Sequence, residues 1–176
     1  MLNCAIHGAQ DLRLIEQAPE PLGATQVRVG VKAVGICGSD LHYYRHGKVG
    51  DFVIREPLTP GHEASGQVLE VGAAVTNVKP GDRVVCNGWG LSETHFGGYA
   101  EKARVKGEWL VKLPDTISEH DAMAIGTAGY TAMLSVLALE AYGVKPEHGP
   151  AIVTGAAGGV GSFALMLFKK AGWHCI

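Results

Sequence analysis

Short apolar runs separated by turn residues make up the first two thirds of the chain. From Cys4 to about Leu113, apolar and polar residues alternate in runs bounded by Gly, Pro, Asp and Asn. Alternation with a period of two is typical of half-buried strands, and closely spaced turns favour a small, strongly curved β barrel. The pattern predicts strands at Leu12–Ile15, Val27–Val31, Gln67–Val71, Arg83–Cys86 and Trp109–Leu113.

The pattern becomes helical in the next stretch. Ser118-Glu-His-Asp121 can cap a helix, and Ala, Met and Leu recur at helical spacing from Asp121 to Tyr142. This stretch predicts one or two linking helices, with Gly129 either at their junction or at a close packing contact. Gly143 then ends the second helix, because glycine tolerates the left-handed conformation common there.

A strand, a glycine-rich turn and a helix follow. Ala151–Thr154 predicts a buried parallel strand, residues 159–171 predict a helix, and residues 173–176 predict the start of another strand. The expected fold class is therefore α/β plus β, with a β domain followed by the first part of a nucleotide-binding domain. We expect that second domain to be truncated.

Composition narrows the choice of partners. Hydrophobic residues make up 47% of the 176 residues, charged residues make up 18%, and the formal net charge is −2. This balance gives no electrostatic reason to expect nucleic acid or an anionic membrane as partner, so a small molecule fits better. Four scattered cysteines favour a reducing compartment. With no leader pattern and no run of about 18 apolar residues, the expected location is cytoplasmic.

Two short blocks carry candidate metal ligands. Cys37 lies in Gly35-Ile-Cys-Gly-Ser-Asp-Leu-His42, and His62 and Glu63 lie in Pro60-Gly-His-Glu-Ala-Ser-Gly66. A thiolate and an imidazole are typical zinc ligands, and Glu63 is either a third ligand or an adjacent carboxylate. Zinc in such a site would polarise a substrate hydroxyl and lower its pKa, so that hydride can leave.

Three further residues of the first block are candidate catalytic groups. Ser39 and His42 can pass a proton from the substrate to solvent, because a hydroxyl beside the metal and an imidazole three residues further on form a relay. Asp40 can hold His62 in the correct tautomer. A single Cys or His is more often a packing residue, so the joint occurrence of both blocks carries the prediction.

The glycine-rich turn is a candidate cofactor site. Glycines after a strand let the backbone approach a pyrophosphate, and the amides at the following helix N-terminus favour its negative charge. This pattern indicates NAD or NADP. The candidate cofactor-binding residues are Gly155, Gly158, Gly159, Val160 and Gly161.

The front of the chain resembles a known family. The two metal-ligand blocks, together with Val78-Lys-Pro-Gly-Asp-Arg-Val84, are similar to the zinc-dependent medium-chain dehydrogenases, in the branch of sorbitol and L-idonate 5-dehydrogenases. The resemblance covers about residues 1–86. It implies a GroES-like β-barrel catalytic domain with linking helices at residues 1–145 and the start of a Rossmann domain at 146–176. It also implies a polyol pocket lined by Tyr43, Tyr44 and Phe52.

The rest of the chain resembles another branch of that superfamily. His95-Phe-Gly-Gly-Tyr99, Ile125-Gly-Thr-Ala-Gly129 and Thr154-Gly-Ala-Ala-Gly158 are similar to the zinc-free acrylyl-CoA reductases and quinone oxidoreductases. Residues 87–99 replace the four-cysteine lobe of many polyol enzymes, so no structural zinc is expected. The Glu-Pro pair that polyol enzymes carry near the metal is replaced by residues 123–131.

The predicted function is NAD(P)-dependent, zinc-type oxidation of a secondary alcohol in a polyol or sugar acid. The resemblance implies a homo-oligomeric full-length enzyme. A zinc-free NADPH-dependent acrylyl-CoA or quinone reductase is the first alternative. A truncated or composite fragment without activity is the second.

Overall fold

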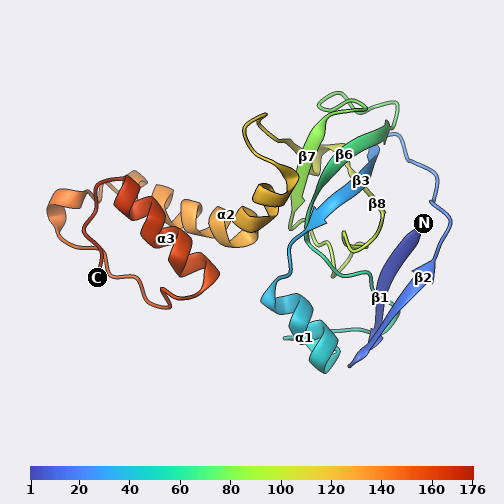
Figure 1. The fold of residues 1–176 in the computed structure, drawn as a ribbon, viewed down its shortest axis with the longest axis horizontal. Coiled ribbons are helices and arrows are strands. Elements are labelled where there is room, and N and C mark those ends of the chain that lie inside the picture. The colour runs from blue at the N-terminus through green and yellow to red at the C-terminus, as the bar shows by residue number, and fades with distance from the viewer. The chain divides into compact units, whose positions relative to one another are not determined.

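The computed structural model describes residues 1–176, and the contacts within the chain divide them into two units, Met1–Ala124 and Ile125–Ile176. The first unit is built around an antiparallel five-stranded sheet with strand order β8-β3-β6-β7-β9. Figure 1 shows β3, β6 and β7 side by side. The sheet strands are β3 (Gln26–Val34), β6 (Glu63–Val71), β7 (Arg83–Asn87), β8 (Lys102–Lys106) and β9 (Val111–Lys112).

Two hairpins complete the strands of this unit. β1 (Leu2–Gly8) pairs with β2 (Asp11–Glu16), and β4 (Lys48–Val49) pairs with β5 (Phe52–Val53). Bridges from β1 to Leu58 and Ala100 tie the first hairpin to the loops beside the sheet. The strands therefore form an open sheet with two hairpins, without a closed ring of strand pairs.

The alternating pattern placed four of the five strands of the sheet and β2, but it missed β8 and the strands β1, β4 and β5. Each predicted strand overlaps an observed one, although β9 is preceded by a short 3-10 helix, η1 (Gly107–Trp109). The inward residues form one apolar core, as expected when alternate side chains share a face. This core contains Val27, Val29, Val68, Val78, Val84, Cys86, Leu91, Val105, Trp109 and Leu110.

A short helix follows β3 and begins at the first candidate metal ligand. α1 (Gly38–His46) has Cys37 as its N-cap and ends at Gly47, whose φ of 65° suits a residue without a side chain. The N–H of Gly47 donates to the carbonyl of Tyr43 at 2.9 Å. The helix is thus fixed at both ends.

The long helix α2 (Glu119–Ala141) begins in the first unit and continues in the second. The backbone N–H of Asp121 donates to the hydroxyl of Ser118 at 3.0 Å, which confirms the predicted cap. The helix is interrupted at Gly126, with φ of 48° and ψ of −156°, and not at Gly129. A Cβ at Gly129 would lie 2.6 Å from the side chain of Ile125, so this glycine serves close packing.

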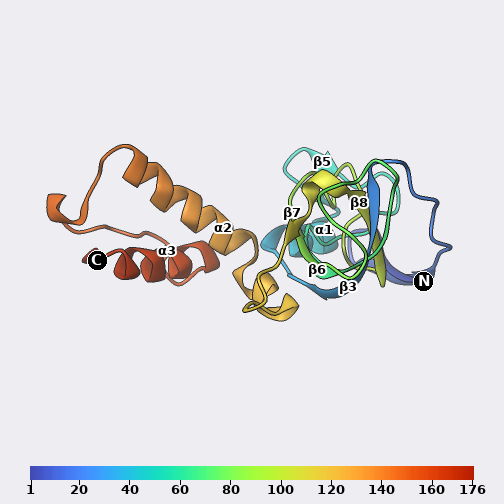
Figure 2. The same ribbon diagram turned by 90° about the horizontal axis from the view of Figure 1, so that it is seen from above.

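The second unit contains the rest of α2, a 3-10 helix η2 (Pro146–His148) and α3 (Gly159–Lys170). Both views show α3 alongside the later part of α2 (Figures 1 and 2). The two predicted strands are reduced to one parallel bridge, Ala151 with Cys175, supported by backbone hydrogen bonds. By length and composition alone α2 could cross a membrane, and 33% of its apolar window is buried. Ala132 and Val136 of this helix pack with α3 in a small apolar core of the second unit.

Candidate metal centre and cavity

The structure brings the three predicted metal ligands together. One ligand atom from each of Cys37, His62 and Glu63 lies within 4.8 Å of the other two. Nε2 of His62 is 3.8 Å from Oε1 of Glu63. Ligands bound tetrahedrally to zinc at 2.0–2.3 Å are separated by about 3.5 Å, so small side-chain movements suffice to hold the ion. The donor set therefore fits zinc.

A glycine makes room for the carboxylate of this cluster. A Cβ on Gly35 would lie 2.2 Å from Oε2 of Glu63, which is far shorter than any non-bonded contact, so only glycine fits here without a clash. The N–H of Gly35 donates to the carbonyl of Glu63 at 2.9 Å, and this backbone hydrogen bond joins the loop before Cys37 to the start of β6. Only 7% of Glu63 is exposed. The place of Gly35 two residues before Cys37 was a signal in the sequence, but its contact with Glu63 depends on the fold.

Asp40 joins the two ligand blocks through their backbones. Its carboxylate accepts hydrogen bonds from the N–H of Cys37 at 2.8 Å and from the N–H of Gly61 at 3.3 Å. Its Oδ1 is 3.9 Å from Nδ1 of His62, which is longer than a hydrogen bond. Asp40 is buried, so it acts here chiefly as a link between the segments that carry Cys37 and His62.

Tyr99 also supports the site and was not predicted. Its hydroxyl donates to the carbonyl of Gly35 at 3.2 Å. Burial, followed by the negative charge of Asp40, raises the pKa of Tyr99 well above its usual value. Tyr99 therefore remains a neutral donor that holds the loop before Cys37 in place.

The proposed proton relay lies on α1. Ser39 is half-buried, His42 is exposed, and the His42 ring lies 5.8 Å from the ring of His46. Residues three apart share one side of a helix, so the order from the interior to solvent runs from Ser39 to His42. Their role as a relay stays a prediction.

The glycine-rich turn leads directly into α3. Gly155 has φ of 64°, and Gly158 is the N-cap of the helix. A Cβ on Gly161 would lie 2.4 Å from the carbonyl oxygen of Gly155, so this glycine lets the helix pack on the turn. Gly159 and Val160 are exposed in the first turn, where backbone amides have no partner within the helix. The turn can thus offer amides to an anion, and its binding role stays a prediction.

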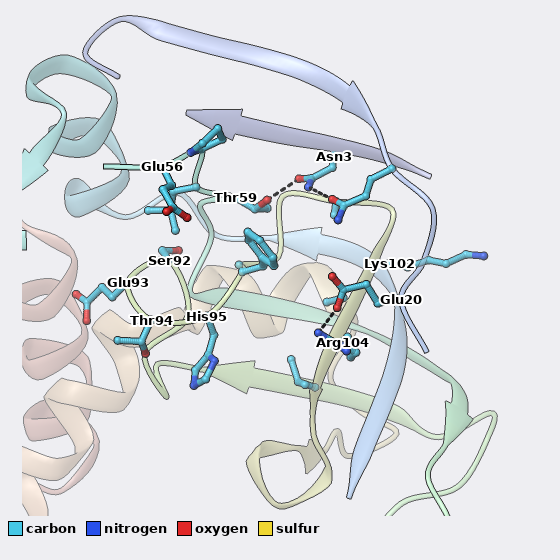
Figure 3. A pocket seen from close by; sticks show the side chains of 18 of the residues that line it. Asn3, Glu20, Glu56, Thr59, Ser92, Glu93, Thr94, His95, Lys102 and Arg104 are labelled. Atoms are coloured by element: carbon cyan, nitrogen blue, oxygen red, sulfur yellow. Dashed lines mark hydrogen bonds and ion pairs between the residues drawn. The ribbon is translucent and has the colours of Figure 1, made fainter. Parts of the chain in front are cut away.

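A cavity of about 720 Å³ lies within the first unit. Tyr43 and Phe52 line it, as the resemblance implied, whereas Tyr44 and the candidate metal ligands do not. Figure 3 shows Glu56, Ser92 and Glu93 to one side of the view and Glu20, Lys102 and Arg104 to the other. His95 lines the same cavity.

Comparisons with known proteins agree with this architecture. Residues 23–115 match the alcohol dehydrogenase GroES-like domain. The chain is 43% identical over 162 residues to acrylyl-CoA reductase AcuI of Ruegeria pomeroyi, covering 90% of this chain and 48% of the relative. It is 55% identical over 84 residues to sorbitol dehydrogenase of Gallus gallus, covering 47% of this chain and 23% of the relative.

Solved structures show the same fold. The yhdH oxidoreductase of Salmonella enterica in complex with NADP matches with a TM-score of 0.88 and 39% identity, covering 99% of this chain and 54% of that one. The chain thus spans about half the length of AcuI and of the yhdH oxidoreductase. The reductase match extends over most of the chain, and the sorbitol dehydrogenase match is confined to 84 residues.

Proposed function

Because this chain belongs to the medium-chain dehydrogenase/reductase family, we propose that it serves NAD(P)-dependent, zinc-type oxidation of a secondary alcohol to a ketone. The observation that carries the proposal is the convergence of Cys37, His62 and Glu63 within 4.8 Å. A thiolate, an imidazole and a carboxylate from two distant blocks form a donor set suited to zinc. When bound, zinc supplies Lewis-acid polarisation of a substrate hydroxyl.

The chain's own residues supply the remaining tasks. Asp40 keeps the blocks of Cys37 and His62 together through two backbone hydrogen bonds. Ser39 receives the proton that the alcohol releases, and His42 passes it to solvent. The turn at Gly155–Gly161 holds the dinucleotide pyrophosphate, in line with the NADP complex of the Salmonella relative.

The proposed substrate is a polyol or sugar acid. The 55% identity to sorbitol dehydrogenase over 84 residues, which include Cys37, His62 and Glu63 in the resembling blocks, supports this class.

A second function is favoured by one specific observation. The similarity to acrylyl-CoA reductase extends over 162 residues, almost twice the length of the sorbitol dehydrogenase match. The alternative is therefore an NADPH-dependent reduction of acrylyl-CoA or a quinone without zinc. In that case Cys37, His62 and Glu63 form a polar cluster with no metal.

Metal analysis and paired assays separate the two functions. We expect about one zinc per purified chain, lost in Cys37→Ser, and NAD(P)+-dependent oxidation of xylitol that requires this zinc. If a zinc-free chain reduces acrylyl-CoA with NADPH, the dehydrogenase proposal is wrong. Zinc binding without either activity would support the metal site but not the proposed oxidation.

A further inference from the structure

The start of β6 and the end of β7 are neighbours in the sheet, and their register pairs Glu63 with Asn87. One step further along, the N–H of Gly88 donates to the carbonyl of His62 at 2.8 Å. Hydrogen-bonded and non-hydrogen-bonded pairs alternate along an antiparallel ladder, so Glu63 and Asn87 form a non-hydrogen-bonded pair. In such a pair the Cα atoms are about 4.5 Å apart and the side chains lie close together on one face. Asn87 is thus the direct neighbour of a candidate metal ligand.

The face of the sheet that carries this pair is polar and lies against the start of α2. Cys86 belongs to the apolar core, so Asn87, the next residue, lies on the other face of β7. On that face the hydroxyl of Ser65 donates to the backbone carbonyl of Glu119 at 2.8 Å. Arg83 donates to the carboxylate of Glu119 at 3.0 Å. Polar groups shielded from water in this way need hydrogen-bond partners.

The side-chain oxygen of Asn87 is buried and has no hydrogen-bond partner. A half-turn about the last side-chain bond of an asparagine exchanges the positions of Oδ1 and Nδ2, so a donor can take the place of an unpaired acceptor. Glu63 is only 7% exposed, and an ionised carboxylate accepts hydrogen bonds but donates none. The neighbour of Asn87 therefore suits the donor end of its amide and not the acceptor end.

We propose that Asn87 is a positioning residue of the metal centre, whose side-chain NH2 group donates to the carboxylate of Glu63. A hydrogen bond to one carboxylate oxygen orients the other oxygen toward the ion. The inference rests on the proposed zinc-type function and deepens it, because it adds to that site a residue that does not touch the ion. Residue 87 follows directly the stretch that resembles the zinc-dependent branch, so the rest of the chain contributes to the same site.

The first experiment compares the zinc affinity of the full chain with that of Asn87→Leu, by competition with a chromophoric chelator. Leucine has a similar shape but no amide, and we expect zinc to bind about 10-fold more weakly, as is typical when a ligand loses its hydrogen-bond partner. Asn87→Ala, which adds no bulk, should show the same loss. In Asn87→Leu saturated with Co2+, the sulfur-to-cobalt band should persist, because Cys37 is unchanged, while the visible bands that report ligand geometry should shift.

Asn77→Leu is the matched control for these variants. Nδ2 of Asn77 donates to the carbonyl of Gly107 at 2.8 Å, and neither residue belongs to a ligand block. This substitution should lower the midpoint of urea unfolding and leave the zinc affinity unchanged. The control therefore separates a general loss of stability from an effect on the metal centre.

A double-mutant cycle tests whether Asn87 acts through Glu63. In the metal-free chain, Asn87→Leu should lower the urea midpoint more in the wild-type background than in Glu63→Ala, because the hydrogen bond exists only in the first. Equal shifts in both backgrounds, or wild-type zinc affinity in Asn87→Leu, would overturn the inference and leave the metal centre itself intact. A wild-type chain that binds no zinc would contradict the proposed function and the inference with it.

Discussion

Replacing Asp40 by Asn tests how the candidate metal centre is held together. The carboxylate accepts from the N–H of Cys37 at 2.8 Å and from that of Gly61 at 3.3 Å, and the residue is 4% exposed. An amide keeps one acceptor oxygen but turns an NH2 group toward the other backbone donor. One charge-assisted hydrogen bond is lost, and two donors then face each other in the interior.

The expected loss of stability from Asp40→Asn is large for a single isosteric change. A hydrogen bond to a charged group contributes about 1.5–3 kcal/mol, and a buried unpaired donor adds about 1 kcal/mol or more. We therefore expect Asp40→Asn to lower the free energy of unfolding by about 2–4 kcal/mol, or the Tm by roughly 10 °C. Zinc affinity should fall at least about 10-fold, because Cys37 and His62 lose their common support.

Urea unfolding and zinc titration of the same samples measure both effects. Asp121→Asn is the matched control, because it changes an exposed carboxylate bonded to Ser118 and should leave the free energy of unfolding close to that of the wild type. If Asp40→Asn keeps wild-type stability and zinc affinity, Asp40 does not join the two blocks and the reasoning is refuted.

Three other predictions concern the relay, the cofactor turn and a buried thiol. Ser39→Ala should lower turnover and shift its pH profile while zinc content stays at the wild-type level; loss of zinc would contradict the relay. Gly161→Ala places a Cβ 2.4 Å from the Gly155 oxygen and should weaken NADP+ binding at least about 10-fold by calorimetry, whereas equal affinity would reject the site. Burial raises the pKa of the Cys86 thiol from 9.0 to about 12. Between these pH values the thiol is therefore ionised in the unfolded chain but still protonated in the folded chain. Stability should then fall as the pH rises from 9 towards 12, less so in Cys86→Val, and equal slopes in urea unfolding would argue against it.

The sequence predicted those parts of the molecule that depend on residues close together in the chain. Alternating residues located β3, β6 and β7, because side chains on a strand alternate between two faces. The ligand blocks around Cys37 and His62 were recognisable as short continuous motifs. Their meeting in space agrees with the expected site.

Features that depend on long-range contacts could not be read from the sequence. The support of Gly35 by Tyr99 joins residues 64 positions apart, and the steric contact of Gly35 with Glu63 requires the register of β3 and β6. The helix is interrupted at Gly126, which the sequence did not distinguish, whereas Gly129, expected at the junction or at a close packing contact, lies at a packing contact. The place of Asn87 beside Glu63 depends on the pairing of β7 with β6, which no local motif signals.

The most direct test of the account is the absorption spectrum of the chain loaded with Co2+ in place of zinc. Because Cys37 is a proposed ligand, we predict a sulfur-to-cobalt charge-transfer band and the intense visible bands of a tetrahedral site. The charge-transfer band should vanish in Cys37→Ser, and both sets of bands should weaken in His62→Ala. It should persist in Cys86→Val, whose thiol lies in the apolar core. A chain that binds no cobalt, or whose spectrum is the same in Cys37→Ser, would contradict the proposed metal centre.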